Sequence, residues 1–229
     1  MRNIFFILLI ACSVEVHSQF VKRRNPVRMN TEAFGNMVME LNRQYQQVRK
    51  LKMQIVSELT SVELNSMDNE WKTAYIKNVT EKMERETADV GPADAIKIVQ
   101  EIGKEAMSSP ELIARYNANH YYIEFRDYVS KNRKDLNIAD CKASVIGVCT
   151  KIGLKVQNID YVNGEYPELG NALYSYSLVI INKPRSYRDW LYLIYLSAKC
   201  GNDDAKSQAE DYMLFKDKSM ITKHSISLF

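Results

Sequence analysis

The strongest hydrophobic pattern in the chain lies between residues 34 and 62. Apolar side chains recur there in alternating steps of four and three residues, with Lys52 as the one polar position in the series. Such steps average 3.5 residues, the period of helices that wind around one another in a left-handed coiled coil. The apolar members of this seam are Phe34, Val38, Leu41, Tyr45, Val48, Ile55, Leu59 and Val62. We therefore predict a long helix with a narrow assembly seam, covered either by a second chain or by a later helix of the same chain.

The pattern after this seam predicts further helices separated by short polar breaks. Ser109, Pro110 and Glu111 form a typical helix start, with a capping serine, a proline in the first turn and an acid near the helix N-terminus. Residues 154–164 are the one segment expected to form a strand or an ordered loop. The expected helices cover residues 69–85, 93–107, 110–131, 140–151, 167–181, 186–200 and 203–216, with Asp140 and Ser186 as capping residues.

Together these elements predict a mainly α-helical fold. Residues 31–135 are expected to form an antiparallel helical bundle that contains the long heptad helix, because short connections favour antiparallel neighbours. A smaller α-helical subdomain is expected over residues 139–216, followed by a tail over 217–229. Residues 192–213 resemble one turn of a tetratricopeptide-type helical hairpin, but the segment does not recur at a fixed period, as a repeat fold requires.

The first 18 residues indicate export. A basic residue precedes an apolar run over residues 4–11, which has the length of a signal-peptide core and is too short to span a bilayer. Val16 and Ser18 are compact residues at the −3 and −1 positions of a cut before Gln19. The competing interpretation is a lipoprotein, because residues 9–12 resemble a lipobox that would make Cys12 the acylated first residue.

Residues 19–30 contain a proline and show no periodicity, so we expect an extended arm. Its four basic residues are Lys22, Arg23, Arg24 and Arg28. This arm could touch anionic lipid headgroups at a membrane surface, or it is simply solvated. Positive charge so soon after the apolar run is unfavourable for translocation, and it is the one feature that counts against export.

Composition narrows the function classes. The net charge of +3 is small and gives no reason to expect nucleic acid as a partner, since nucleic-acid binding usually requires a clustered basic face. With 8 glycines and 5 prolines in 229 residues, tight turns and phosphate-binding glycine loops should be scarce. The chain has no glycine-rich nucleotide motif and no Gly-x-Ser-x-Gly nucleophile motif. We therefore predict no enzymatic activity and no cofactor.

A few residues are candidates for catalytic or redox chemistry. His120 and Glu124 are four residues apart on one helix face with Ile113, Tyr116 and Ile123, which suits a general base or simply a packed histidine. After export the chain would keep three cysteines, Cys141, Cys149 and Cys200. Cys141 and Cys149 are about 12 Å apart if helical, too far for a disulfide, although either could meet Cys200. We predict no metal site, because two histidines remain and no metal-ligand spacing occurs.

Aromatic residues concentrate in the C-terminal half of the chain. A groove of tyrosine and tryptophan could hold a peptide or a glycan, because each ring has an apolar face and a polar edge. The rings considered for such a groove are Tyr174, Tyr176, Tyr187, Trp190, Tyr192 and Tyr195. The same composition also suits a helical core.

Two functional hypotheses follow. The first is an exported, non-catalytic helical scaffold of the periplasm or cell envelope, which assembles through the heptad helix with itself or with an apparatus such as one for secretion or conjugation. The second is a helical, tetratricopeptide-like binding module for a peptide or glycan, which uses the aromatic C-terminal half.

Overall fold

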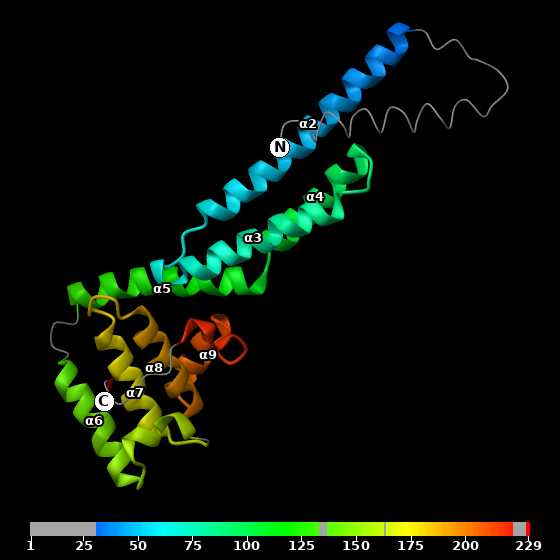
Figure 1. Ribbon diagram of the computed structural model, residues 1–229. Helices are drawn as coiled ribbons and strands as arrows, with labels where there is room; N and C mark the ends of the chain where they lie inside the picture. Colours follow the sequence, from blue (N-terminus) through cyan, green and yellow to red (C-terminus); the bar gives the residue numbers. More distant parts are fainter. Residues whose placement is uncertain (1–30, 133–136, 163, 222–227) are drawn as a thin grey trace. The chain divides into compact units, whose positions relative to one another are not determined.

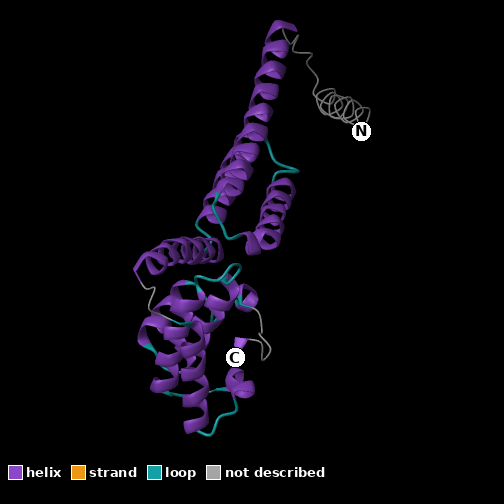
Figure 2. Ribbon diagram, turned by 90° about the vertical axis from the view of Figure 1, so that its left-hand side faces the viewer, coloured by secondary structure: helices purple, strands orange, loops and turns teal. Residues whose placement is uncertain are grey.

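The computed structural model describes residues 31–132, 137–162, 164–221 and 228–229. Every regular element in these ranges is a helix and none is a strand, as Figure 2 shows. The prediction of a mainly α-helical chain is therefore confirmed. The helices (Figure 1) are α2 (Thr31–Ser61), α3 (Asn69–Glu86), α4 (Pro92–Met107), α5 (Pro110–Asn132), α6 (Ile138–Lys151), α7 (Pro167–Ile180), α8 (Tyr187–Lys199) and α9 (Asp203–Asp211), with short 3₁₀ helices η1 (Ser66–Asp68), η2 (Val156–Tyr161) and η3 (Lys218–Met220).

The chain divides into two compact units, residues 1–47 and 48–229, and the boundary falls within α2. We call residues 31–47 the outer half of α2 and residues 48–61 its inner half. The inner half belongs to the second unit together with all later elements.

Two hydrophobic cores lie within the second unit. The first contains side chains of the inner half of α2, of α3 and α4, and of the start of α5. An added Cβ at Gly103 would lie 2.5 Å from Ile55 Cδ1, so the missing side chain leaves room for Ile55 against α4. The buried members of this first core are Val48, Ile55, Leu59, Val79, Met83, Ala95, Val99, Ile102, Ala106 and Leu112.

The second core is centred on α7 and α8. Helix α7 packs against both α6 and α8, and α8 packs against α9. The fully buried Trp190 on α8 contacts aromatic rings from α5 and from the residues after α9. Helix α5 contributes to both cores, with Leu112 in the first and Tyr122 and Val129 in the second.

Local capping explains most of the helix boundaries and corrects some predictions. Pro92 and Pro167 stand in the first turns of α4 and α7, where the missing N–H costs nothing. Helix α6 is capped by Asn137, whose side chain accepts a hydrogen bond from the Ala139 N–H at 2.9 Å, and not by Asp140 as predicted. The segment expected as a strand or loop contains the 3₁₀ helix η2.

The capping of α8 and the end of α9 differ in part from the predictions. Ser186 is the N-cap residue of α8 as predicted, but its side chain makes no capping hydrogen bond, because its hydroxyl donates to the Ile181 carbonyl at 3.2 Å and lies 3.0 Å from the Tyr122 hydroxyl. Helix α9 ends at Asp211 and not near residue 216, and the next turn contains Met213 at a positive φ of 55°.

The described part of the predicted tail is packed against the second core. Met220 and Leu228 are buried, and the Tyr176 hydroxyl donates to the Leu228 carbonyl at 2.8 Å. The ring of Phe229 lies 6.0 Å from that of Tyr176. Apolar residues at the end of the chain are therefore part of the core and do not form a free tail.

Candidate functional site

The outer half of α2 carries an apolar stripe that faces solvent. Phe34, Val38, Leu41 and Tyr45 are 44%, 46%, 47% and 51% exposed. With 3.6 residues per turn these four side chains lie on one face of the helix. Single exposed apolar residues are ordinary, but a contiguous row of them typically marks a surface for another macromolecule.

The inner half of α2 continues the same stripe, and there the chain itself covers it. Val48, Ile55 and Leu59 are buried in the first core, and Val62 just beyond the helix is half-buried. The eight residues of the predicted seam thus fall into two groups, four exposed and four covered.

Lys52, the polar position of the seam, meets the end of α3. Its Nζ donates to Thr87 Oγ1 at 2.7 Å and lies 3.0 Å from Glu84 Oε2. The lysine stem can pack along apolar neighbours while its ammonium group reaches these partners.

Helix α5 has a second exposed apolar stripe. Ile113, Tyr116 and Ile123 are 44%, 44% and 42% exposed. The His120 ring is stacked on that of Tyr116 with centroids 6.0 Å apart, and its Nε2 lies 3.3 Å from Glu124 Oε1. We call Ile113, Tyr116, His120 and Ile123 the α5 stripe. His120 is therefore packed on an aromatic ring of its own helix, as one interpretation predicted, but its side chain is 58% exposed and not buried.

The face of α5 that turns inward consists mainly of small and polar residues. Periodicity of large apolar residues could not have identified it, because that pattern follows the exposed stripe. The buried residues of α5 are Leu112, Ala114, Arg115, Ala118, Asn119, Tyr122 and Val129.

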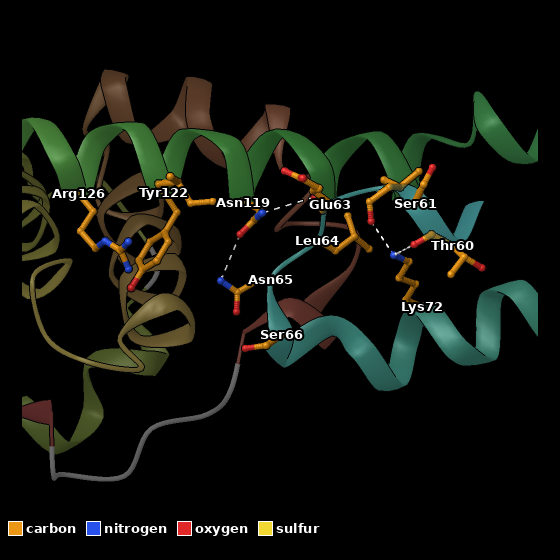
Figure 3. A pocket seen from close by; sticks show the side chains of 12 residues that line it. Thr60, Ser61, Glu63, Leu64, Asn65, Ser66, Lys72, Asn119, Tyr122 and Arg126 are labelled. Carbon is orange, nitrogen blue, oxygen red and sulfur yellow. Dashed lines mark hydrogen bonds between the residues drawn. The ribbon is translucent and has the colours of Figure 1, made fainter. Parts of the chain in front are cut away.

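A hollow of about 510 Å³ lies beside the α5 stripe, between α5 and the segment that joins α2 to η1 (Figure 3). Ile123 belongs to both the stripe and the hollow. The Arg126 guanidinium lies 5.6 Å from the centroid of the Tyr122 ring at one end of the hollow. The hollow is lined by Thr60, Ser61, Val62, Glu63, Leu64, Asn65, Ser66, Lys72, Asn119, Tyr122, Ile123 and Arg126.

Hydrogen bonds across this hollow hold the end of α2 in place. Lys72 Nζ donates to the carbonyl oxygens of Thr60 and Val62, where a cation is favourable because the helix dipole is negative. The Asn65 amide donates to Asn119 Oδ1 at 3.3 Å, as Figure 3 shows. The polar groups of the hollow therefore serve the local structure, and we assign no ligand to it.

A buried ion cluster lies on the inward face of α5. Arg115 is 1% exposed, and its guanidinium donates to Asp68 Oδ1 at 3.2 Å, to Asp217 Oδ2 at 2.6 Å and to Ser219 Oγ at 2.7 Å. Its carbon Cζ also lies 4.2 Å from the centroid of the Trp71 ring. The cluster ties η1, α3 and the C-terminal segment to α5.

Charge in this cluster is costly to bury. Asp68 is 3% exposed and its Oδ2 has no hydrogen-bond partner among the described residues. Burial raises the pKa of Asp68, and the attraction of Arg115 and Arg188 offsets only part of that effect. The sequence held no local signal for this cluster, because Asp68 and Asp217 are 47 and 102 positions from Arg115.

The aromatic residues proposed as a ligand groove lie mostly in the second core. Tyr176, Tyr187, Trp190 and Tyr192 are at most 3% exposed, so these rings do not form an open groove. Their large apolar area explains why they fill the interior, where Tyr187 and Trp190 contact Tyr122 of α5.

The two remaining rings, Tyr174 and Tyr195, are half-buried. The hydroxyl of Tyr174 accepts a hydrogen bond from Gln208 Nε2 at 3.2 Å, and burial raises its pKa to about 12. Tyr195 packs at 5.6 Å against the ring of Phe215. Both rings therefore also have partners within the chain.

The candidate catalytic residues are not brought together as a reactive pair. Cys149 is buried on α6, and burial raises the pKa of its thiol, whereas His120 is exposed on α5. Cys141, Cys149 and Cys200 are free thiols, and burial raises the pKa of Cys200 to about 11. A nucleophilic cysteine requires the opposite shift.

The described residues offer neither a metal-binding cluster nor a membrane-spanning helix. No group of three or more histidine, cysteine, aspartate or glutamate side chains is placed to hold a metal ion there. None of the helices in these ranges is long and apolar enough to cross a membrane. The predicted signal peptide, the basic arm and Cys12 lie outside the described residues.

Comparisons with protein-family models, with curated proteins and with solved structures find no match to this chain. The function proposed below therefore rests on the residues and their geometry alone.

Proposed function

We propose that this chain is an exported, non-catalytic helical scaffold of the cell envelope that assembles through the outer half of α2. The observation that carries this proposal is the row of four apolar side chains, Phe34, Val38, Leu41 and Tyr45, that faces solvent. Covering them in an assembly would remove apolar area from water at about 25 cal/mol per Å². The setting we propose is an envelope apparatus, such as one for secretion or conjugation.

The spacing of the row supports a helical partner. The four residues follow one another in steps of four, three and four, the heptad spacing of a coiled-coil seam. The inner half of α2 uses the same spacing to pack in the first core, with α3 and α4. We propose that this first core is an antiparallel helical bundle and that the outer half of α2 extends its seam to a partner.

The alternative function, a peptide- or glycan-binding module in the aromatic half, gains no support from the packing. Four of its six rings fill the second core, and the other two contact side chains of the same chain.

Assembly is tested by light scattering of the purified protein over a range of concentrations. The double variant Val38→Glu/Leu41→Glu places two charges in the row and should raise the dissociation constant by about 100-fold or more, since each 1.4 kcal/mol corresponds to a factor of ten. The matched control, Asn36→Glu/Gln47→Glu, adds the same charges to the opposite face of the helix and should assemble normally.

Circular dichroism should show equal helicity for both variants, because all four positions are exposed. If Val38→Glu/Leu41→Glu keeps the mass of the unsubstituted protein, the row is not an assembly surface and the proposal fails.

Export is tested separately by determining the N-terminus of the protein recovered from the cell envelope. We expect the mature chain to begin at Gln19. Incorporation of labelled fatty acid that is lost in Cys12→Ala would instead identify a lipoprotein, and a retained Met1 would contradict export by either route.

A further inference from the structure

Two buried cysteines lie where the ends of two helices meet the start of a third. Cys149 is in the last turn of α6 and Cys200 is the C-cap residue of α8, and each is 1% exposed. We infer that these two thiols are a redox-sensitive pair, which forms an internal disulfide when a disulfide oxidant such as oxidised glutathione is present. The inference goes beyond assembly through α2 and does not depend on it.

Hydrogen bonds hold the chain beside both cysteines against the start of α7. The backbone N–H of Tyr166, the N-cap residue of α7, donates to the Cys200 carbonyl at 2.9 Å. Two residues after Cys149, Lys151 Nζ donates to Glu168 Oε2 in the first turn of α7 at 2.7 Å. The end of α6 and the end of α8 therefore meet at the same end of α7.

A further contact joins the segment after α6 directly to the end of α8. Lys199, the residue before Cys200, donates from its Nζ to the Asp160 carbonyl in η2 at 2.9 Å. Both cysteines also belong to the second core. Burial raises the pKa of Cys200 to about 11, the charge of Lys199 lowers it, and a charge on Cys149 raises it. The two thiols therefore lie within electrostatic range of each other.

The third described cysteine, Cys141, is not a suitable partner for either thiol. It precedes Cys149 by eight residues on α6, a distance of about 12 Å at the rise of a helix, whereas the Cα atoms of a disulfide are at most about 7 Å apart. Burial raises the pKa of Tyr176, and the charges of Asp189 and Cys141 raise it further. Cys141 therefore lies toward the C-terminal half of α7, away from the end where Cys200 is held.

A hollow approaches one of the two thiols. It has a volume of about 580 Å³ and is lined by residues between 146 and 157, at the end of α6 and the start of η2. Cys149 is one of its lining residues and Cys200 is not. We therefore expect an oxidant to reach Cys149 first.

The reaction is two successive thiol–disulfide exchanges. The thiolate of Cys149 attacks one sulfur of oxidised glutathione, which releases one reduced glutathione and leaves a mixed disulfide on the protein. The thiolate of Cys200 then attacks the Cys149 sulfur and releases the second reduced glutathione. Two thiol protons and two electrons leave the protein, and one oxidised glutathione is reduced. Because burial raises the pKa of both thiols, the reaction should be slow at neutral pH and faster at higher pH.

The pair is tested on the folded, full-length protein with an excess of oxidised glutathione at about pH 8.5, where more of each thiol is ionised. The remaining thiols are alkylated in urea, and the protein is digested without a reductant. Mass spectrometry should find a cross-linked pair of peptides that contains Cys149 and Cys200. Alkylation of these two cysteines should fall by about 10-fold or more, while Cys141 stays alkylated.

Three alanine variants assign the roles of the thiols. Cys200→Ala removes the thiol that resolves the mixed disulfide, so glutathione should stay attached to Cys149 and add its mass to the protein. Cys149→Ala removes the thiol that reacts first and should leave Cys200 unmodified over the same time. Cys141→Ala, the matched control on α6, should form the same disulfide as the unsubstituted protein. Circular dichroism establishes that each variant is folded.

Peptide mapping of the unsubstituted protein decides the question even where a variant does not fold. The inference is overturned if Cys149 and Cys200 both stay alkylated in the folded protein, while the same oxidant forms disulfides in the chain unfolded in urea. A disulfide from Cys141 to either thiol, or one that joins two copies of the chain, also overturns it. None of these outcomes bears on assembly through the outer half of α2, which light scattering measures separately.

Discussion

The two halves of α2 carry one hydrophobic pattern in two different environments. In the inner half, Val48, Ile55 and Leu59 lie in a core with α3 and α4, whereas in the outer half Val38 and Leu41 are nearly half exposed. The spacing of the apolar residues is the same on both sides of the boundary at residue 47. A heptad seam therefore predicts that one face of a helix will be covered. It does not predict whether the same chain or another chain covers that face.

The polar contacts of the two halves differ in the same way. Around the inner half, Lys52 donates to Thr87, which follows α3, and Lys72 donates to the carbonyl oxygens of Thr60 and Val62 at the end of α2. In the outer half, the contacts of Glu40 with Arg43 and Gln44 are between neighbours on one helix turn. The inner half is held by side chains of other elements, whereas the contacts just named in the outer half lie within the helix itself.

The largest loss of stability should come from disrupting the buried ion cluster of Arg115, Asp68 and Asp217. Asp68 in this cluster follows the inner half of α2 in the chain. Arg115→Ala leaves Asp68 and Asp217 without their cation and should reduce the free energy of unfolding by about 3–5 kcal/mol. The matched change Arg43→Ala, on the exposed outer half, should cost less than about 0.5 kcal/mol. Urea unfolding of both variants measures the difference, and equal costs would refute the contrast between the halves.

The next largest effect on stability is expected when the same leucine-to-alanine substitution is made in the inner half and in the outer half of α2. Leu59→Ala removes a side chain that is 1% exposed and should cost about 2–5 kcal/mol, the range for leucine-to-alanine changes in cores. Leu41→Ala should cost less than about 0.5 kcal/mol when measured at concentrations where the protein is monomeric. At higher concentrations Leu41→Ala should weaken assembly. A large cost for Leu41→Ala in the monomer would mean that the chain covers its own outer row.

The smallest expected effect is a pH dependence of the free energy of unfolding, caused by Asp68 in the buried ion cluster. Burial raises the pKa of Asp68 above its ordinary value of 3.8 despite the nearby Arg115 and Arg188, and the charge of Asp217 raises it further. An acid with a raised pKa binds its proton more tightly in the folded chain. The stability it contributes is therefore lost as the pH rises from about 4 through the raised pKa.

Asp68→Asn removes this titration while keeping the shape of the side chain. The free energy of unfolding of the unsubstituted protein, relative to this variant, should fall as the pH rises above about 4, measured by urea titrations at several pH values. Parallel pH profiles for the two proteins would show that Asp68 has an ordinary pKa in the folded chain.

Most helix positions could be predicted from the sequence because their determinants are local. The expected helices over 69–85, 93–107 and 110–131 agree with α3, α4 and α5 to within one residue at each end. Pro92 and Pro110 begin their helices for reasons confined to one turn. Where the prediction was wrong, as in the choice of Asp140 over Asn137 as a cap, two local candidates competed and the longer helix was formed.

The candidate binding surfaces were harder to predict than the helices, because the burial of a side chain depends on residues that are distant in the sequence. The apolar stripe of Ile113, Tyr116 and Ile123 on α5 is exposed, while the buried face combines Arg115, Asn119 and two alanines with Leu112, Tyr122 and Val129. Likewise, the rings around Trp190 suggested a ligand groove and instead fill the second core. In both cases residue type alone predicted the wrong environment, because the packing of two cores on either side of α5 determined which face turned inward.

The sequence by itself determined that this chain is helical and where its helices lie, because periodicity, capping and helix-breaking residues act within a few positions of one another. Only the tertiary structure decided which half of α2 is covered, which face of α5 is buried and which carboxylates Arg115 binds. Those outcomes depend on groups as far apart in sequence as Arg115 and Asp217, and they are set by the apolar area and the charge that the folded chain brings together.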